Sequence, residues 1–358
     1  MKTLSVLFLG FILLLTSCKK ESAITIPTTY NFSNVNYDGQ TARLEMLQAM
    51  TTYMKTANTS GTTISATTLK AMFANEGNPF IEASLNISGK DIKSKTFGAD
   101  VTMFEDYMEA LGTLSGTTAV ASAGTAGIAT SGSKAYLLNE NGVEYTQLIE
   151  KRLMGALSYY QISENYTRDA KIGIAVDNET VEIGKGTDME HHWDEAFGYI
   201  GANKTLDDAN YSYHAKYAGK GEDAGLETRT NLINAFLAGR AAISTKNTDR
   251  KNEEAINVRK YMDETTVTTA IHYLNGAKEN LTDYAISCHE LSEAYAFIIS
   301  LKYNADAKIT TTELAEVKAF LENSAEEPDF ANITVANINS AIDKLSTVYS
   351  LDAVKATL

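Results

Sequence analysis

The sequence predicts an all-α protein built as a helical bundle, and three observations support this fold class. Apolar residues recur at i, i+3, i+4 and i+7 spacing through most of the chain, which is the pattern of amphipathic helices. The alternating runs that are typical of strands are sparse. The 358 residues include only 3 prolines, so long stretches can be helical without interruption.

The N-terminus has the layout of a secretory signal peptide that ends at a lipidated cysteine. Lys2 precedes an apolar segment from Leu4 to Leu15, which is shorter than the roughly 20 residues that span a bilayer. The run Leu15-Thr-Ser-Cys18 then places small residues before a cysteine, as a lipobox does. We expect residues 1–17 to be removed and Cys18 to carry lipid in the cell envelope. The alternative is an ordinary signal peptide followed by an unmodified cysteine.

The rest of the chain divides into a short tether and one large helical body. Residues 18–35 are polar and are expected to be a tether, and residues 36–358 are expected to form a single helical domain. Residues 24–112 could also form a separate domain or wrap around the bundle. Helices are expected, in chain order, at about 40–56, 67–74, 101–111, 144–166, 188–200, 226–244, 252–278, 281–303, 311–323 and 335–347. Loops are expected at 112–134, which consists mostly of Gly, Ala, Ser and Thr, and at 203–223, which is polar and rich in Tyr. Residues 171–187, which contain Gly and β-branched residues, are expected to be an excursion between helices.

Two segments of the chain resemble each other. His191-His-Trp-Asp-Glu195-Ala-Phe-Gly-Tyr199 and His289-Glu-Leu-Ser-Glu293-Ala-Tyr-Ala-Phe297 share the pattern His-x-x-x-Glu-Ala-aromatic-small-aromatic. The segments before them also correspond, since each contains Glu-Asn-x-Thr. We interpret this as two helical hairpins, about 144–200 and 252–303, related by duplication and packed as a four-helix bundle. The alternative is chance similarity between amphipathic helices.

The repeated motif carries residues that can bind a metal ion. Residues four apart lie on one face of a helix, so each motif would project an imidazole and a carboxylate together. If the two hairpins face each other, His191, His192, Glu195, His289 and Glu293 could form one site for iron or another transition metal. His192 is also three residues before Glu195, so it could replace His191 as a ligand. The alternative is that these pairs form structural hydrogen bonds and bind no metal.

Composition and missing motifs exclude several classes of function. The net charge of −14 and the absence of a basic cluster argue against a nucleic-acid partner. His289-Glu290 begins like the zinc-protease motif His-Glu-x-x-His, but residue 293 is Glu, so the motif fails. No nucleophile elbow or phosphate-binding loop is present, and enzyme activity is not supported. The other cysteine, Cys288, lies in an apolar helix and is expected to be a buried small hydrophobic residue.

Three stretches of the chain resemble a bacterial lipoprotein family called domain of unknown function 4856. They are Tyr30-Asn-Phe32, Tyr37-Asp-Gly-Gln-Thr-Ala-Arg-Leu-Glu-Met46, and the run from His191 to Tyr199. This resemblance implies an envelope location and a helical fold over most of the chain, but no activity.

A more distant resemblance is to the imelysin family, whose signature is Gly-x-His-x-x-Glu. His192-Trp-Asp-Glu195 matches its second half, whereas residue 190 is Glu in place of Gly. Imelysins are secreted or lipid-anchored helical bundles linked to iron uptake. This resemblance implies that His192 and Glu195 belong to a metal site.

These observations lead to two main hypotheses. The first is an outer-membrane lipoprotein, on the periplasmic or cell-surface face, that binds a transition metal or an iron complex for an uptake system. The second is an interaction or scaffold protein that docks on an outer-membrane transporter and uses the His/Glu pairs structurally. A peptidase or other hydrolase is a third hypothesis, which the failed protease motif disfavours. Convergence of the His and Glu side chains would separate the first two.

Overall fold

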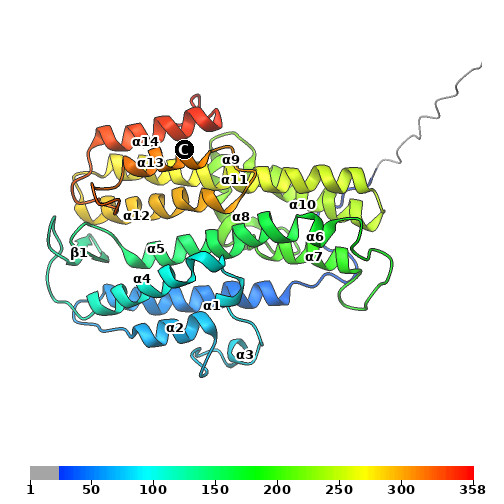
Figure 1. Cartoon of the computed structure of the whole chain (residues 1–358), viewed down its shortest axis with the longest axis horizontal. Coiled ribbons are helices and arrows are strands. Elements are labelled where there is room, and N and C mark those ends of the chain that lie inside the picture. The colour runs from blue at the N-terminus through cyan, green and yellow to red at the C-terminus, as the bar shows by residue number, and fades with distance from the viewer. Residues whose placement is uncertain (1–23) are drawn as a thin grey trace, which may run out of the picture.

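The computed structural model describes residues 24–358, and helices dominate it, which confirms the all-α prediction (Figure 1). The predicted signal peptide and Cys18 lie outside the described residues. The first α-helices are α1 (Asp38–Lys55), α2 (Ala66–Ala74), α3 (Ala83–Asn86), α4 (Val101–Leu114), α5 (Tyr145–Leu153), α6 (Asp169–Ile172) and α7 (Asp188–Gly198). The later ones are α8 (Tyr213–Tyr217), α9 (Gly219–Asp223), α10 (Thr228–Ser244), α11 (Thr248–Glu279), α12 (Tyr284–Ser300), α13 (Thr311–Ala319) and α14 (Val335–Tyr349). No helix among residues 24–358 is both long enough and apolar enough to cross a membrane.

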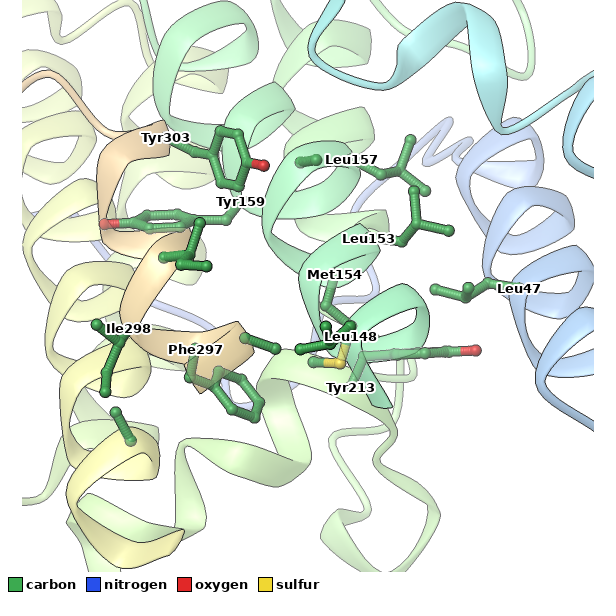
Figure 2. Packing of buried hydrophobic residues seen from close by; sticks show 14 of the residues in the cluster. Leu47, Leu148, Leu153, Met154, Leu157, Tyr159, Tyr213, Phe297, Ile298 and Tyr303 are labelled. Carbon is green, nitrogen blue, oxygen red and sulfur yellow. The ribbon is translucent and has the colours of Figure 1, made fainter. Parts of the chain in front are cut away.

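The long helices pack side by side around the pair α11 and α12, which are neighbours in sequence and in space. α10 packs on α11, and α5 packs on α12. On the far side of α5 lie α1, α2 and α4, while α13 and α14 cover α11 and α12 from the opposite side (Figure 1). The N-terminal helices therefore share one contiguous hydrophobic core with the rest of the described chain. Figure 2 shows part of this core, with Leu148 and Met154 between Leu47 of α1 and Phe297 of α12.

The helix that begins with α5 continues as two π-helical segments, η4 (Met154–Tyr159) and η5 (Gln161–Tyr166). A π-helical turn is wider than an α-helical one, because each amide bonds to the carbonyl five residues before it. The carbonyl of Ala156 accepts from the Phe97 amide at 2.8 Å, and that of Met154 accepts from His214 Nε2 at 3.1 Å. Burial lowers the pKa of His214 to about 4, so the ring is a neutral donor. His214 thus ties α8 to this wide turn.

The N-terminal segment before α1 is fixed to α7 and α10. Tyr30 is fully buried and stacks on Phe197 with ring centroids 3.6 Å apart. Its hydroxyl donates to Asp194 Oδ1 at 3.0 Å, and Arg240 Nε donates to the same oxygen at 2.8 Å. Arg240 Nη2 also donates to the Ser33 carbonyl at 3.3 Å. The chain is therefore part of the folded body from Tyr30 onward, before the predicted start of the domain at residue 36.

α7 approaches α10 closely at a glycine. The indole of Trp193 is fully buried and donates from Nε1 to the Phe236 carbonyl at 2.9 Å. A Cβ atom on Gly239 would lie only 2.0 Å from Cζ2 of this indole. Glycine at this position allows the two helices to approach, at the usual cost of glycine in a helix.

Two of the predicted loops contain regular structure. The segment predicted as a loop at 112–134 leads into an antiparallel hairpin of β1 (Gly127–Ser131) and β2 (Lys134–Leu138), with Gly127 opposite Leu138. Gly132 makes the turn with φ of +58°. β1 contains a single large apolar residue, so its small residues conceal the strand in the sequence. The segment 203–223 contains the short helices α8 and α9, which pack on α11.

Candidate functional site

The first His/Glu motif lies on α7, which begins with a capping box formed by Thr187 and Glu190. Glu195 Oε1 accepts hydrogen bonds from Gln40 Nε2 at 2.8 Å and from the Tyr166 hydroxyl at 3.2 Å. His192 Nδ1 lies 2.8 Å from the Lys171 carbonyl, so this nitrogen carries the proton. These contacts tie α7 to α1, η5 and α6.

The His192 imidazole has no nitrogen left for a metal ion in this arrangement. Its Nε2 lies 3.3 Å from the Lys171 ammonium, which can only donate. Burial lowers the pKa of His192 in spite of the hydrogen bond to the Lys171 carbonyl, and this favours the neutral ring. His191 is half-buried, and its Nδ1 has no hydrogen-bond partner among the described residues. His192 and Glu195, the α7 pair, therefore bond to other groups of the protein, whereas Nδ1 of His191 does not.

The second motif lies on α12, where His289 stands between two carboxylates. Its Nδ1 is 2.6 Å from Glu144 Oε2, and its Nε2 is 3.6 Å from Glu293 Oε2. The Tyr136 ring of β2 stacks on the imidazole, with centroids 4.2 Å apart and planes inclined by 19°. The His289 side chain keeps 20% of its exposure, so this centre is reachable from solvent. Four residues thus form one site, the α12 centre: His289 and Glu293 of α12, Tyr136 of β2, and Glu144 before α5.

Glu144 is placed by the start of α5, which it immediately precedes. Its backbone amide donates to Ser292 Oγ at 2.9 Å, which aligns the start of α5 with α12. The carboxyl group is fully buried, and its Oε1 has no hydrogen-bond partner among the described residues. Buried polar atoms are rarely left without a partner. Glu144 therefore has an acceptor oxygen in reserve beside the imidazole.

Glu293 uses its two oxygens differently. Oε1 lies 3.3 Å from the ammonium of Lys151, while Oε2 faces His289. Lys151 is buried and also pairs with Glu150 at 2.9 Å. The ring of Tyr217 lies under the same ammonium, with its centroid 5.4 Å away. The result is a row of alternating charges from Glu150 to Glu144 along the α5–α12 interface.

This charge pattern controls the protonation of His289. Burial by itself lowers the pKa of an imidazole. Here the hydrogen bond and the negative charge of Glu144, together with the charge of Glu293, outweigh burial and raise the pKa of His289 above its ordinary value. Without a metal ion, the imidazole therefore favours a proton between its two carboxylates.

The two motifs do not converge in the described structure, which corrects the expectation that the two hairpins face each other. α7 packs on α1, α6, α10 and η5, whereas α12 packs on α5, α11, α13 and the hairpin. Figure 1 places α7 and α12 towards opposite ends of the molecule. The contacts given above for His192 and Glu195 involve none of the partners of His289 and Glu293. Within residues 24–358, no group of three or more His, Cys, Asp or Glu side chains is arranged to hold a metal ion.

Sequence reasoning missed the partners that complete the α12 centre. Glu144 lies 145 positions from His289, so its role depends on tertiary packing. One signal was present, since Glu150-Lys-Arg152 places three consecutive charges on the predicted helix 144–166, and any of them that is buried must find a partner. Cys288 is buried as expected, and burial raises the pKa of its thiol to about 12.

Comparison with known proteins gives one match. A family model described as Domain of unknown function (DUF4856) matches residues 27–352. No curated protein and no solved structure matches the chain. The match begins beside Tyr30 and includes both His/Glu motifs.

Proposed function

The chain belongs to the Domain of unknown function (DUF4856) family, and from this premise, which names no activity, we propose a function based on the α12 centre. The proposal is a cell-envelope lipoprotein, anchored through Cys18, that binds a transition metal or an iron complex at His289 and Glu293 for an uptake system. It replaces the five-residue site expected from the sequence by a smaller one. The iron-linked role draws on the resemblance to imelysins.

The observation that carries the proposal is the geometry of the two facing ligand atoms. His289 Nε2 and Glu293 Oε2 are 3.6 Å apart. Two ligands bound at about 2.1 Å from one metal ion and separated by this distance subtend roughly 118°, which is close to tetrahedral. Both side chains could therefore bind one ion without moving apart.

The surroundings support this geometry. Metal-binding histidines usually donate their other ring nitrogen to a carboxylate, which fixes the tautomer. Glu144 is placed to accept that hydrogen bond from Nδ1 at 2.6 Å. Lys151 lies 3.3 Å from Oε1 of Glu293, so Oε2 is the oxygen that faces the imidazole. Two protein ligands leave coordination positions open, as binding of a metal complex requires.

Metal content after equilibrium dialysis tests the proposal. The protein would be the mature chain from residue 18 with Cys18→Ser, dialysed against Zn²⁺, Cu²⁺ or Fe²⁺ at pH 7.5. We expect one bound ion per chain, and for Cu²⁺ a nitrogen coupling in the electron paramagnetic resonance spectrum. His289→Ala and Glu293→Gln should weaken binding by at least about tenfold, because each removes a ligand.

The α7 pair provides the matched control. His192→Ala removes an imidazole that is half-buried, as His289 is, and whose nitrogens are already bonded, so it should leave metal binding unchanged. The proposal fails if the wild type binds no ion, or if His289→Ala binds as well as the wild type while both remain helical by circular dichroism.

The alternative is an interaction protein that docks on an outer-membrane transporter, with both pairs serving only the fold. One observation favours it, namely that Lys171, Gln40 and Tyr166 already bond the α7 pair. Under this alternative His289→Ala lowers stability, because Glu144 loses its buried partner, while metal content is zero in every variant.

A further inference from the structure

A cleft of about 760 Å³ opens between α10, α11 and the N-terminal segment, and it shares no residue with the α12 centre. Its walls come from residues 26–28, from the loop around Tyr211, and from one face each of α10 and α11. Sites for small ligands commonly have volumes of roughly 300–1,000 Å³, so the cleft is large enough for a ligand of several rings.

The charged residues of the cleft are paired with one another. Arg229 bonds Asp208 at 3.3 Å. Arg250 bonds Glu254, and its other terminal nitrogen lies 3.6 Å from Glu253. A ligand with a strong charge of either sign would have to break these pairs, and the net charge of −14 further disfavours an anion.

The free polar groups of the cleft are neutral. Asn231 and Asn234 lie three residues apart on α10 and therefore on one face of this helix. In the described part of the chain, neither side-chain amide has a hydrogen-bond partner, nor do the hydroxyls of Tyr211 and Tyr261. Each amide offers donors and an acceptor, and each phenol offers a hydroxyl beside a flat apolar ring.

We propose that this cleft binds a neutral carbohydrate. Sugar hydroxyls donate and accept at once, as the two asparagine amides do, and the apolar C–H faces of pyranose rings pack against tyrosine rings. The open cleft accommodates part of a longer glycan chain. This site is independent of the proposed metal centre.

Affinity electrophoresis tests the proposal on the mature chain with Cys18→Ser. Native gels would contain amylopectin, xyloglucan, galactomannan or dextran as neutral polymers, and polygalacturonate as an anionic one. We expect retardation by at least one neutral polymer and none by polygalacturonate. Asn231→Ala/Asn234→Ala and Tyr261→Ala should each weaken the apparent affinity by about tenfold or more, the equivalent of one or two lost contacts.

Gln48→Ala is the matched control, because it truncates an exposed amide on α1, outside the cleft, and should leave retardation unchanged. The proposal is overturned if no neutral polymer retards the protein, if only polygalacturonate does, or if the double variant is retarded like the wild type. Each variant would be checked by circular dichroism. Since the cleft variants touch no residue of the α12 centre, metal binding and glycan binding can fail separately.

Discussion

Asp263 on α11 is a buried carboxyl group that has no ion-pair partner among the described residues. The hydroxyls of Tyr159 and Tyr349 each donate to its Oδ1 at 3.0 Å. The amide of Lys308 donates to Oδ2 at 3.1 Å. Burial outweighs these donors and raises the pKa of Asp263 to about 6. The native state therefore prefers the protonated form more than the unfolded chain does.

This shift predicts a pH-dependent contribution to stability. Because the folded pKa lies above the unfolded one, the contribution is fully present at low pH and is lost as the pH rises through about 6. Asp263→Asn removes the titration. The free energy of unfolding of the wild type, relative to this variant, should fall by about 2 kcal/mol between pH 4.5 and 7.5. Urea unfolding followed by Trp193 fluorescence measures it.

Asp106→Asn serves as the control, since it removes one negative charge from an exposed position on α4. A difference between wild type and Asp263→Asn that stays constant across this pH range would contradict the prediction.

The sequence predicted part of the α12 centre at this scale. The pair His289 and Glu293 follows from i, i+4 spacing on a helix, which is a local property. Glu144, Lys151 and Tyr136 could not be predicted, because their contacts depend on how α5 and the hairpin pack on α12. On α7 the spacing of His191 and Glu195 is the same, but that helix packs on α1, α6, α10 and η5, so the same local pattern has different partners there.

At the scale of elements, apolar periodicity predicted the helices well. The expected helices at 67–74 and 226–244 correspond to α2 (Ala66–Ala74) and α10 (Thr228–Ser244). The π-helical segments η4 and η5 were not predictable, since they depend on partners such as His214 that lie far away in the sequence. The β1–β2 hairpin was missed because β1 contains a single large apolar residue and the hairpin packs on α12, a contact that lies far away in the sequence.

The contact between α7 and α10 leads to a prediction at the same scale. Alanine normally stabilises a helix relative to glycine by up to about 1 kcal/mol. At Gly239 the new methyl group would overlap the Trp193 indole, so Gly239→Ala should instead lower the free energy of unfolding by about 2 kcal/mol or more. A lower melting temperature with a changed Trp193 emission spectrum would report this.

Gly276→Ala on α11 is the matched control. There the methyl group would meet only the carboxyl end of Glu290, a flexible side chain that can move away. We expect this variant to be as stable as the wild type or slightly more stable. Equal losses in the two variants would mean that helix packing at Trp193 has no special role.

At the scale of the whole molecule, the N-terminal segment and the bundle are expected to unfold together. Tyr30 is fully buried against Phe197 and bonds Asp194, so Tyr30→Ala should cost about 3–5 kcal/mol of stability. Tyr30→Phe removes only the hydroxyl and should cost about 1 kcal/mol. Thermal unfolding followed by circular dichroism and by Trp193 fluorescence measures both variants.

Coincident transitions from the two probes are expected in the wild type, because Trp193 lies next to Asp194, which bonds Tyr30, while circular dichroism reports on all helices. An early separate transition in the fluorescence of the wild type would indicate that the segment and α7 unfold on their own.

The contacts that hold Tyr30 and Ser33 against α7 and α10 also determine how the protein would respond to mechanical tension. A pull on the chain from its N-terminal side would enter the folded body at Tyr30 and Ser33, and would be carried by α7 and α10. The ring stack, the bond to Asp194 and the bond from Arg240 to the Ser33 carbonyl lie together, so they would share the load instead of breaking one at a time. A protein tethered at this end would thus bear the tension first in the contacts of Tyr30 and Ser33 with α7 and α10.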